Sequence, residues 1–334
     1  MKNVGLVGLG FIGKTHLAAY NHIENARVKV ICTKNKVTDE QTTGQCQASF
    51  VTEYDDLLRD QEIDIIDICL PTHLHEQYII KAANAGKHII CEKPLTLTLD
   101  SASRIMAAVK RNNVHLFVAH VLRFWPEYKT IKSYSQSDKL KNIEIVHAKR
   151  LGQVPAWSSW FQYPEKSGGA LYDLHLHDID FVYYLLGEVN SVYAVGNKNR
   201  YGAWDHVMTT LSFKNGGKAF VEASQRMPAG FPFTMSFRAQ TSRSTLDFHV
   251  AAGENIENIN ESNKYFVYCS YQDKAHIETD DSDPFQNELS YFVNCVENNQ
   301  DNDVIPLMDV LYTLKVLQAI EVSLKTGDKV RVMR

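Results

Sequence analysis

The amino-acid sequence predicts an α/β Rossmann domain with a doubly wound parallel sheet, followed by an α+β domain with a large, mostly antiparallel open sheet. Up to about residue 123, short apolar strands alternate with helical segments, and the glycine run Gly8, Gly10 and Gly13 follows the first strand. Beyond residue 186, β-rich segments succeed one another with hairpin-type connections. A chain of 334 residues exceeds one ordinary core. We therefore expect two domains, residues 1–123 and 124–334.

The composition excludes several function classes. With 44% hydrophobic and 22% charged residues, the chain is typical of a globular protein. The net charge of −4 is spread along the chain without a long basic run, so no nucleic-acid partner is expected. No segment approaches the roughly 18 apolar residues of a membrane span. Residues 1–13 lack the basic flank and cleavage site of a signal peptide. Six cysteines without a CxxC pair favour reduced thiols and a cytoplasmic location.

The first half of the chain has the rhythm of βαβ units. Apolar runs predict strands, and apolar positions at helical spacing predict the helices between them. Gly86 is a typical residue just after a helix end. This alternation predicts a parallel sheet covered on both faces. The expected strands are 3–7, 28–32, 63–70, 87–91 and 114–118, and the expected helices are 11–20, 74–85 and 99–111.

The second half follows a different pattern, which begins where Trp125-Pro126 breaks the alternation. A helical stretch and a longer strand, 143–150, precede one amphipathic helix over residues 170–186. Hairpin-type turns such as Asn215-Gly216-Gly217 then separate β-rich segments, which predicts a largely antiparallel sheet. The expected strands are 192–195, 207–213, 219–223, 233–237, 245–248 and 265–268, followed by helices 285–297 and 308–326 and a last strand, 330–333.

The residues from Gly8 to Gly13 match the pattern GxGxxG at a strand-to-helix turn, which is the context that dinucleotide binding requires. The first glycine permits the turn, the second lets the backbone approach a pyrophosphate, and the third lets helix pack on strand. The pyrophosphate would sit on the helix N-terminus. The alternative is a glycine-rich turn with no ligand. The predicted contacts at this turn are Gly8, Gly10, Phe11, Ile12 and Gly13.

The choice of dinucleotide depends on the end of the second strand, about 20 residues further on, where a carboxylate would accept the ribose 2′-hydroxyl of NAD. Thr33 and Lys34 occupy this place, followed by Asn35 and Lys36. No carboxylate there would repel a 2′-phosphate, which favours NADP slightly over NAD. The alternative is an ordinary exposed basic turn, because lysine is a flexible point charge.

Two further motifs give the chain a resemblance to a known family. Cys91-Glu92-Lys93-Pro94 closes the fourth strand, and residues 167–180, SGGALYDLHLHDID, open the helix of the second domain. Together they resemble the signature of the Gfo/Idh/MocA oxidoreductases. The resemblance covers nearly the whole chain. It extends to Pro71-Thr72-His73-Leu74-His75, to Arg123-Phe124-Trp125-Pro126 and to Ala319-Ile320-Glu321-Val322-Ser323.

The resemblance implies that Lys93, Asp173 and His177 form the catalytic set. The residues support these roles. Lys93 follows a strand at the carboxyl edge of the sheet, where its ammonium could stabilise an alkoxide. Asp173 and His177 are four apart and share a helix face, so that the carboxylate could orient an imidazole that exchanges the hydroxyl proton. The alternatives are a solvated lysine and a structural contact between neighbouring helical turns.

The resemblance also implies further cofactor and substrate contacts. We expect loop residues such as Trp160 and Tyr163 to contribute to the substrate pocket, although packing at the domain junction is the alternative for Trp157 and Trp160. His175 stands where the family commonly has a small residue, and it either faces the pocket or packs behind it. Residues two apart on a helix diverge, so we expect no metal at His175 and His177. The implied cofactor contacts are Leu70, Pro71, Thr72, His75, Glu92, Lys93 and Arg123.

These features predict an NAD(P)-dependent oxidoreductase that transfers a hydride between nicotinamide and a secondary hydroxyl or ketone of a sugar, cyclitol or related polyol. One alternative is an NAD-dependent glycosidase that acts by transient oxidation. Another is a non-catalytic dinucleotide-sensing regulator, which the presence of all three catalytic residues argues against. As in relatives, the open sheet is expected to form a homodimer or homotetramer, and the other partner is a small-molecule polyol.

Overall fold

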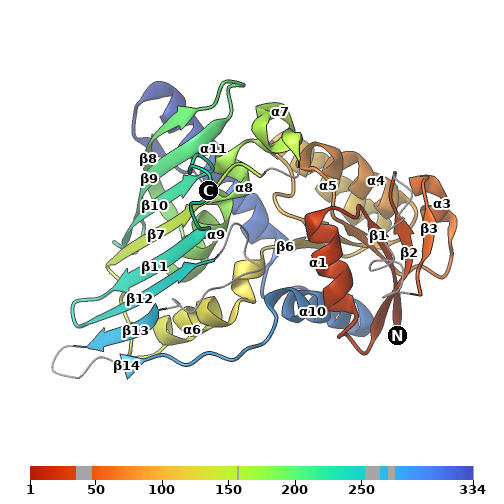
Figure 1. Ribbon diagram of the computed structural model, residues 1–334, viewed down its shortest axis with the longest axis horizontal. Helices are drawn as coiled ribbons and strands as arrows, with labels where there is room; N and C mark the ends of the chain where they lie inside the picture. The colour runs from red at the N-terminus through yellow and green to blue at the C-terminus, as the bar shows by residue number, and fades with distance from the viewer. Residues whose placement is uncertain (35–46, 156–157, 253–263, 270–274, 334) are drawn as a thin grey trace. The chain divides into compact units, whose positions relative to one another are not determined.

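The computed structural model describes residues 1–34, 47–155, 158–252, 264–269 and 275–333, which form two compact units. The first unit comprises Met1–Trp125 and Ser282–Leu311, and the second comprises Pro126–Asp281 and Tyr312–Arg334. The expected boundary after residue 123 lies two residues before the first crossing between units. The return of residues 282–311 to the first unit was not expected. The reason is packing, because helix α10 (Pro284–Asn298) lies beside α1 (Phe11–Tyr20) (Figure 1). Phe292 of α10 also stacks on Phe117 at 4.9 Å.

The described strands of the first unit form a six-stranded parallel sheet in the order β3-β2-β1-β4-β5-β6, which confirms the predicted Rossmann domain. The strand order reverses between β1 and β4, and ligands of doubly wound folds bind at the carboxyl end of such a switch point. All four residues of β4 are buried, as expected for a strand covered on both faces. The strands are β1 (Lys2–Val7), β2 (Ala26–Cys32), β3 (Ser49–Val51), β4 (Ile65–Ile68), β5 (His88–Glu92) and β6 (Leu116–Ala119).

Local sequence signals set the helices of this unit. The Thr98 hydroxyl caps α5 (Leu99–Asn112) by accepting the Ser101 amide, and Asn113 ends that helix with a φ of 51°. Asp283 caps α10 in the same way, with Pro284 in its first turn. Strand β3 and helix α3 (Tyr54–Arg59) were not expected, because elements this short carry little periodicity. The other helices among the described residues of this unit are η1 (Thr72–Leu74), α4 (His75–Asn84) and η2 (Val121–Arg123).

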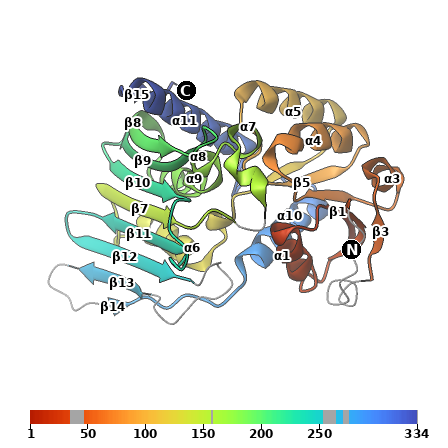
Figure 2. The ribbon, with the colours of Figure 1, turned by 45° about the horizontal axis from the view of Figure 1, so that its top comes forward.

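The described strands of the second unit form a nine-stranded sheet in the order β14-β13-β12-β11-β7-β10-β9-β8-β15 (Figure 2). All neighbouring pairs are antiparallel except β7 and β10, so the predicted mostly antiparallel sheet is confirmed. The strands are β7 (Ile145–Leu151), β8 (Val189–Lys198), β9 (Trp204–Phe213), β10 (Lys218–Ser224), β11 (Thr234–Gln240), β12 (Ser244–Ala251), β13 (Lys264–Cys269), β14 (Ala275–His276) and β15 (Val330–Arg331).

Helices cover one face of this sheet. Along β9, buried residues alternate with less buried ones, as expected when only one face is covered. Tyr128 of α6 (Pro126–Ser135) makes edge contacts with Phe237 and Phe248 of two strands. Helix α11 (Leu307–Thr326) joins the sheet through Ser323, whose hydroxyl accepts the Ala194 amide at 2.9 Å. No helix among the described residues is both long and apolar enough to cross a bilayer.

The helical region expected over residues 170–186 consists of two helices. Helix α8 (Ala170–Asp173) and helix α9 (His175–Leu186) meet at Leu174, where the His177 amide donates to the Leu174 carbonyl three residues back. The turn is therefore tighter than in an α-helix. A buried ion pair anchors α9 to the sheet, because Arg150 of β7 contacts the Asp178 carboxylate at 3.1 Å through Nε.

Candidate functional site

The glycine turn of the first unit has the geometry of a phosphate-binding loop. Gly8 has a φ of +94°, and a Cβ there would lie 2.4 Å from the Cys69 carbonyl oxygen. A Cβ at Gly13 would lie 2.1 Å from the Gly8 carbonyl oxygen. A Cβ at Gly10, the N-cap residue of α1, would meet nothing within 4 Å. The backbone at the helix N-terminus is therefore open at the one glycine where a pyrophosphate must approach, and the turn fits that group.

The second strand ends as the sequence predicted. Thr33 is half-buried just after β2, and its amide donates to the Val51 carbonyl at 3.0 Å. Lys34 is exposed. Asn35 and Lys36 lie outside the described residues. The position expected to meet the adenosine ribose thus carries a hydroxyl and an ammonium within the described chain.

The end of β5 presents the catalytic candidate of this unit. Lys93 is half-buried and follows Glu92, the last residue of the strand, and the Lys93-Pro94 peptide bond is cis. The Glu92 carboxylate turns back and accepts the Lys93 amide through Oε2 at 3.1 Å. Strands β1, β4 and β5 are parallel neighbours, so their carboxyl ends lie at the same edge of the sheet. Lys93 therefore lies at the same edge as the glycine turn.

His75 connects two loops of this edge and is fully buried. Its Nδ1 lies 2.9 Å from the Pro94 carbonyl oxygen, and its Nε2 lies 2.8 Å from the Leu70 carbonyl oxygen. We expected His75 to contact the cofactor. Because both ring nitrogens contact backbone carbonyls, the geometry is that of a residue that holds the two loops together.

The remaining cofactor candidates of the first unit differ in exposure. Leu70 and Pro71 are half-buried in the loop between β4 and η1, and Thr72 is buried. Arg123 is 3% exposed, and its Nη1 donates to the Val304 carbonyl and to Asp309, each at 2.8 Å. The guanidinium expected to reach the cofactor therefore anchors the segment that returns to the first unit.

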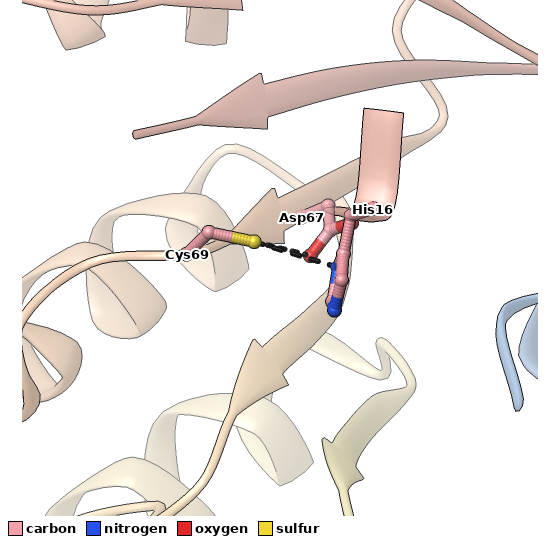
Figure 3. A group of neighbouring side chains, drawn as sticks. All are labelled: His16, Asp67 and Cys69. Atoms are coloured by element: carbon pink, nitrogen blue, oxygen red, sulfur yellow. Dashed lines mark hydrogen bonds and ion pairs between the residues drawn. The ribbon is translucent and has the colours of Figure 1, made fainter. Parts of the chain in front are cut away.

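A buried polar cluster beneath the glycine turn was not identified from the sequence. His16 of α1 lies beside Asp67, with Nδ1 2.9 Å from that carboxylate (Figure 3). Its Nε2 lies 3.2 Å from a second carboxylate, that of Glu92. The Cys69 thiol contacts the His16 imidazole at 3.4 Å and Asp67 at 3.6 Å. Glu288 of α10 is also fully buried nearby. One sequence signal could have revealed the cluster, since Asp67 is a lone carboxylate within an isoleucine run.

The charges within this cluster balance one another in part. Burial alone would lower the pKa of His16, but Cys69 and Asp67 raise it well above its usual value. Burial would raise the pKa of Glu92, but the contact with His16 holds it below its usual value. Burial raises the pKa of Glu288 well above its usual value, and the charge of Glu92 adds to this effect. These shifts favour the charged form of His16 and the neutral form of Glu288.

The catalytic candidates of the second unit flank the junction of α8 and α9. Asp173 ends α8, and its Oδ2 accepts the Gln225 side-chain amide at 2.7 Å. In α9, His177 is half-buried, whereas every other residue from 175 to 182 is buried. His177 is therefore the side chain that this stretch of the helix presents at its surface.

The three expected substrate residues have different environments. His175 is fully buried, with Nε2 2.8 Å from the Thr209 hydroxyl of β9, and burial lowers the pKa of His175 to about 3. This geometry is that of packing against the sheet. Trp160 is half-buried and stacks on Phe161 at 4.0 Å. Tyr163 is half-buried beside Tyr201, and Trp157 lies outside the described residues.

Comparison with known proteins identifies the family. Residues 2–120 match the family model described as "Oxidoreductase family, NAD-binding Rossmann fold", and residues 128–246 match the "GFO/IDH/MocA C-terminal domain". The uncharacterized oxidoreductase YrbE of Bacillus subtilis is 29% identical over 98% of this chain and 96% of its own length. Levoglucosan dehydrogenase of Pseudarthrobacter phenanthrenivorans is 32% identical over 67% of each chain. A solved levoglucosan dehydrogenase in complex with NADH and levoglucosan has a TM-score of 0.82 at 24% identity, with 100% of both chains covered. The chain therefore belongs to the Gfo/Idh/MocA oxidoreductase family.

The glycine turn allows a test that separates dinucleotide binding from folding. We expect Gly10→Ala to keep the stability of the wild type but to bind the dinucleotide about 10-fold more weakly, because its methyl group enters the open space before α1. We expect Gly13→Ala to lose about 2 kcal/mol of stability, because its Cβ would overlap the Gly8 carbonyl. Urea denaturation and fluorescence titration with NAD and NADP measure both quantities. Unchanged dinucleotide affinity in Gly10→Ala would contradict the assignment.

Proposed function

We propose that this chain is an NAD(P)-dependent dehydrogenase that oxidises a secondary hydroxyl of a sugar, cyclitol or related polyol, or reduces the corresponding ketone. The observation that carries the proposal is the shared sheet edge of the glycine turn and Lys93. This edge combines a binding site for a pyrophosphate with the ammonium group of Lys93. Membership of an oxidoreductase family supports the same reaction class.

Each catalytic residue has a role that follows from its chemistry. When bound, the nicotinamide supplies the hydride acceptor or donor. The Lys93 ammonium donates to the substrate oxygen and stabilises the alkoxide character that develops on it. The His177 imidazole takes the hydroxyl proton during oxidation and returns it during reduction. Asp173 ends α8, so it does not share one continuous helix with His177 as expected; its carboxylate accepts the Gln225 side-chain amide, and it is assigned a role in orienting His177.

We assign cofactor binding to the glycine turn and the loops at the same sheet edge. In this assignment, the backbone from Gly8 to Gly13 binds the pyrophosphate. Leu70, Pro71 and Thr72 follow β4 and supply further cofactor contacts from the neighbouring loop. His75 and Arg123 are assigned positioning roles instead, because their polar atoms contact backbone carbonyls and, for Arg123, the Asp309 carboxylate.

Substrate recognition is assigned to the segment before α8. Trp160 and Tyr163 are half-buried aromatic residues, and such rings stack on the apolar faces of sugars and cyclitols. His175 is left out of this set, because it is buried against β9. The named relatives include levoglucosan dehydrogenase and the scyllo-inositol 2-dehydrogenase of Bacillus subtilis, which supports a cyclic polyol. These names do not favour the alternative reaction, glycoside cleavage by transient oxidation.

The central test removes the Lys93 ammonium. A panel of sugars and inositols is screened with NAD and NADP, and reduced nicotinamide is followed by absorbance. We expect Lys93→Met to lower kcat by about 100-fold or more, because one electrostatic donor to the reacting oxygen is lost. Dinucleotide affinity stays within a few fold of wild type. Lys110→Met, which removes an exposed lysine of α5, is the matched control. Wild-type turnover in Lys93→Met, or cleavage without accumulation of reduced nicotinamide, would contradict the proposal.

We infer a preference for NADP over NAD from the end of β2. Thr33 and Lys34 place a hydroxyl and an exposed ammonium where NAD-specific sites carry a carboxylate. Both dinucleotides occur among similar solved structures, since one is a complex with NADH and another is a putative NADPH-dependent oxidoreductase.

The dinucleotide preference is measured by titrating tryptophan fluorescence with both cofactors. An exposed ion pair is worth little, so we expect NADP to bind only about two- to fivefold more tightly than NAD. Lys34→Ala removes this difference by weakening NADP and leaving NAD unchanged. Lys110→Ala serves as the control for a general loss of positive charge. Tighter binding of NAD by the wild-type protein would refute the preference.

We propose that the uncovered face of the second sheet forms a homodimer or homotetramer. Large apolar side chains are exposed on five of its strands, each between 38% and 49%, and a monomer rarely exposes so many on one surface. The partner is a second copy of this chain, as in a face-to-face packing of two sheets. The side chains are Ile145, Tyr193, Val195, Met208, Phe220 and Tyr268.

A charge placed on this face should prevent assembly. We expect the wild type to be dimeric or tetrameric by light scattering and Phe220→Glu to shift it towards monomer, because burying an unpaired carboxylate opposes association. Met308→Glu, an exposed methionine of α11, is the control that should leave the mass unchanged. A monomeric wild type would refute the proposal.

We also infer a cytoplasmic location. All five cysteines within the described part of the chain are free, and four of them are buried. Free thiols in these numbers are typical of a reducing compartment.

A further inference from the structure

The buried cluster around His16 joins three elements that the proposed reaction uses separately. His16 belongs to α1, whose N-terminus carries the glycine turn, and Asp67 belongs to β4. Glu92 ends β5 and directly precedes Lys93. His16 and Asp67 are fully buried, and Glu92 is 7% exposed. The His16 imidazole, with one carboxylate near each ring nitrogen, therefore connects α1 to β4 and to β5, the strand that precedes Lys93.

The contacts determine which form of His16 is stable. Each ring nitrogen of His16 lies within ion-pair distance of a carboxylate, and both contacts favour the positively charged imidazolium. An uncompensated carboxylate in this interior would be costly, which is a second reason for the charged ring. The titratable groups that act on it are Asp67 from β4, Cys69 after β4, Glu92 from β5 and Glu288 from α10, and Tyr20 of α1 interacts with Asp67.

The Glu92 carboxylate transmits this constraint to Lys93. Its Oε1 contacts His16 Nε2 at 3.2 Å, while Oε2 accepts the Lys93 amide at 3.1 Å. One carboxylate thus connects the imidazole to the backbone of Lys93. We propose that His16 is a positioning residue that fixes the Glu92 carboxylate, and through it the Lys93 backbone, relative to α1. This inference rests on the function proposed above, since it assigns a role towards the reactive lysine.

A metal ion is the competing explanation for the same side chains. Ligand atoms of His16, Asp67 and Cys69 all lie within 4.8 Å of one another. Two observations oppose it. Both nitrogens of His16 already contact carboxylates, and burial raises the pKa of the Cys69 thiol to about 12, although a metal ligand must be a thiolate. We therefore assign the cluster as a network of ion pairs and hydrogen bonds and not as a metal site.

Two substitutions of His16 separate its two contacts. Asn places its amide near the position of Nδ1 and can reach Asp67, but it is too short to reach Glu92. Gln places its amide near Nε2 and can still donate to Glu92. We expect His16→Asn to lower kcat by about 10- to 100-fold, because a small displacement of the reactive group is costly. His16→Gln stays within about fivefold of wild type, since its amide can still donate to Glu92.

Other readouts distinguish positioning from general damage. KM and dinucleotide affinity change little in His16→Asn, because the glycine turn is intact, and urea denaturation shows similar stability losses in both variants. In a Glu92→Gln background, His16→Asn lowers kcat by no more than about twofold further, since its effect passes through that carboxylate. Equal loss of kcat in both His16 variants, or independent effects in the double variant, would overturn the proposal.

A measurement that needs no turnover keeps this inference separate from the proposed function. In ¹⁵N NMR spectra of the full chain, the chemical shifts of the His16 ring nitrogens should still be those of an imidazolium at pH 8. This pH lies above the usual histidine pKa of about 6.5. Glu92→Gln should lower the pH at which His16 loses its proton. A neutral ring at pH 8, or one stoichiometric metal ion retained by wild type and lost in Cys69→Ser, would overturn the positioning role. Absence of polyol turnover with an imidazolium present would refute only the proposed function.

Discussion

The close approach of α1 to the end of β1 is the constraint on which the first unit depends. The Gly13 backbone lies where any side chain would overlap the Gly8 carbonyl, and a side chain at Gly8 would overlap the Cys69 carbonyl. This contact brings the N-terminus of α1 to the carboxyl edge of the sheet, where its dipole favours an anion. It also carries His16, one turn further along the helix, over β4 and β5. Anion binding and the buried charge cluster therefore share one cause.

Burial of charge is offset differently in the two units. In the second unit, Arg150 and Asp178 form a direct ion pair that anchors α9, the helix that presents His177. In the first unit, a single cation, His16, serves two carboxylates. Removing either kind of partner would leave an uncompensated charge in the interior, which is far more costly than losing an exposed pair. Both networks hold elements that the proposed reaction uses.

Much of the fold could be predicted from the sequence. The parallel sheet follows from apolar runs alternating with helices, and the antiparallel sheet follows from successive hairpins. The boundaries were less predictable. Helix α10 joins the first unit through contacts such as Phe292 on Phe117, and such contacts leave no trace in local periodicity. The division of α8 from α9 at Leu174 was missed for a similar reason, because residues on both sides have helical spacing.

The sequence by itself determined the glycine turn, the lysine after β5 and the aspartate and histidine of the second unit, because each is a local motif whose chemistry follows from residue type and spacing. Only the tertiary structure decided which polar side chains are buried and what they contact. It placed His175 against β9, used both nitrogens of His75 on backbone carbonyls, and brought His16 between Asp67 and Glu92. These contacts join residues up to 76 positions apart in the chain, and the pairing of strands, which no local pattern encodes, creates them.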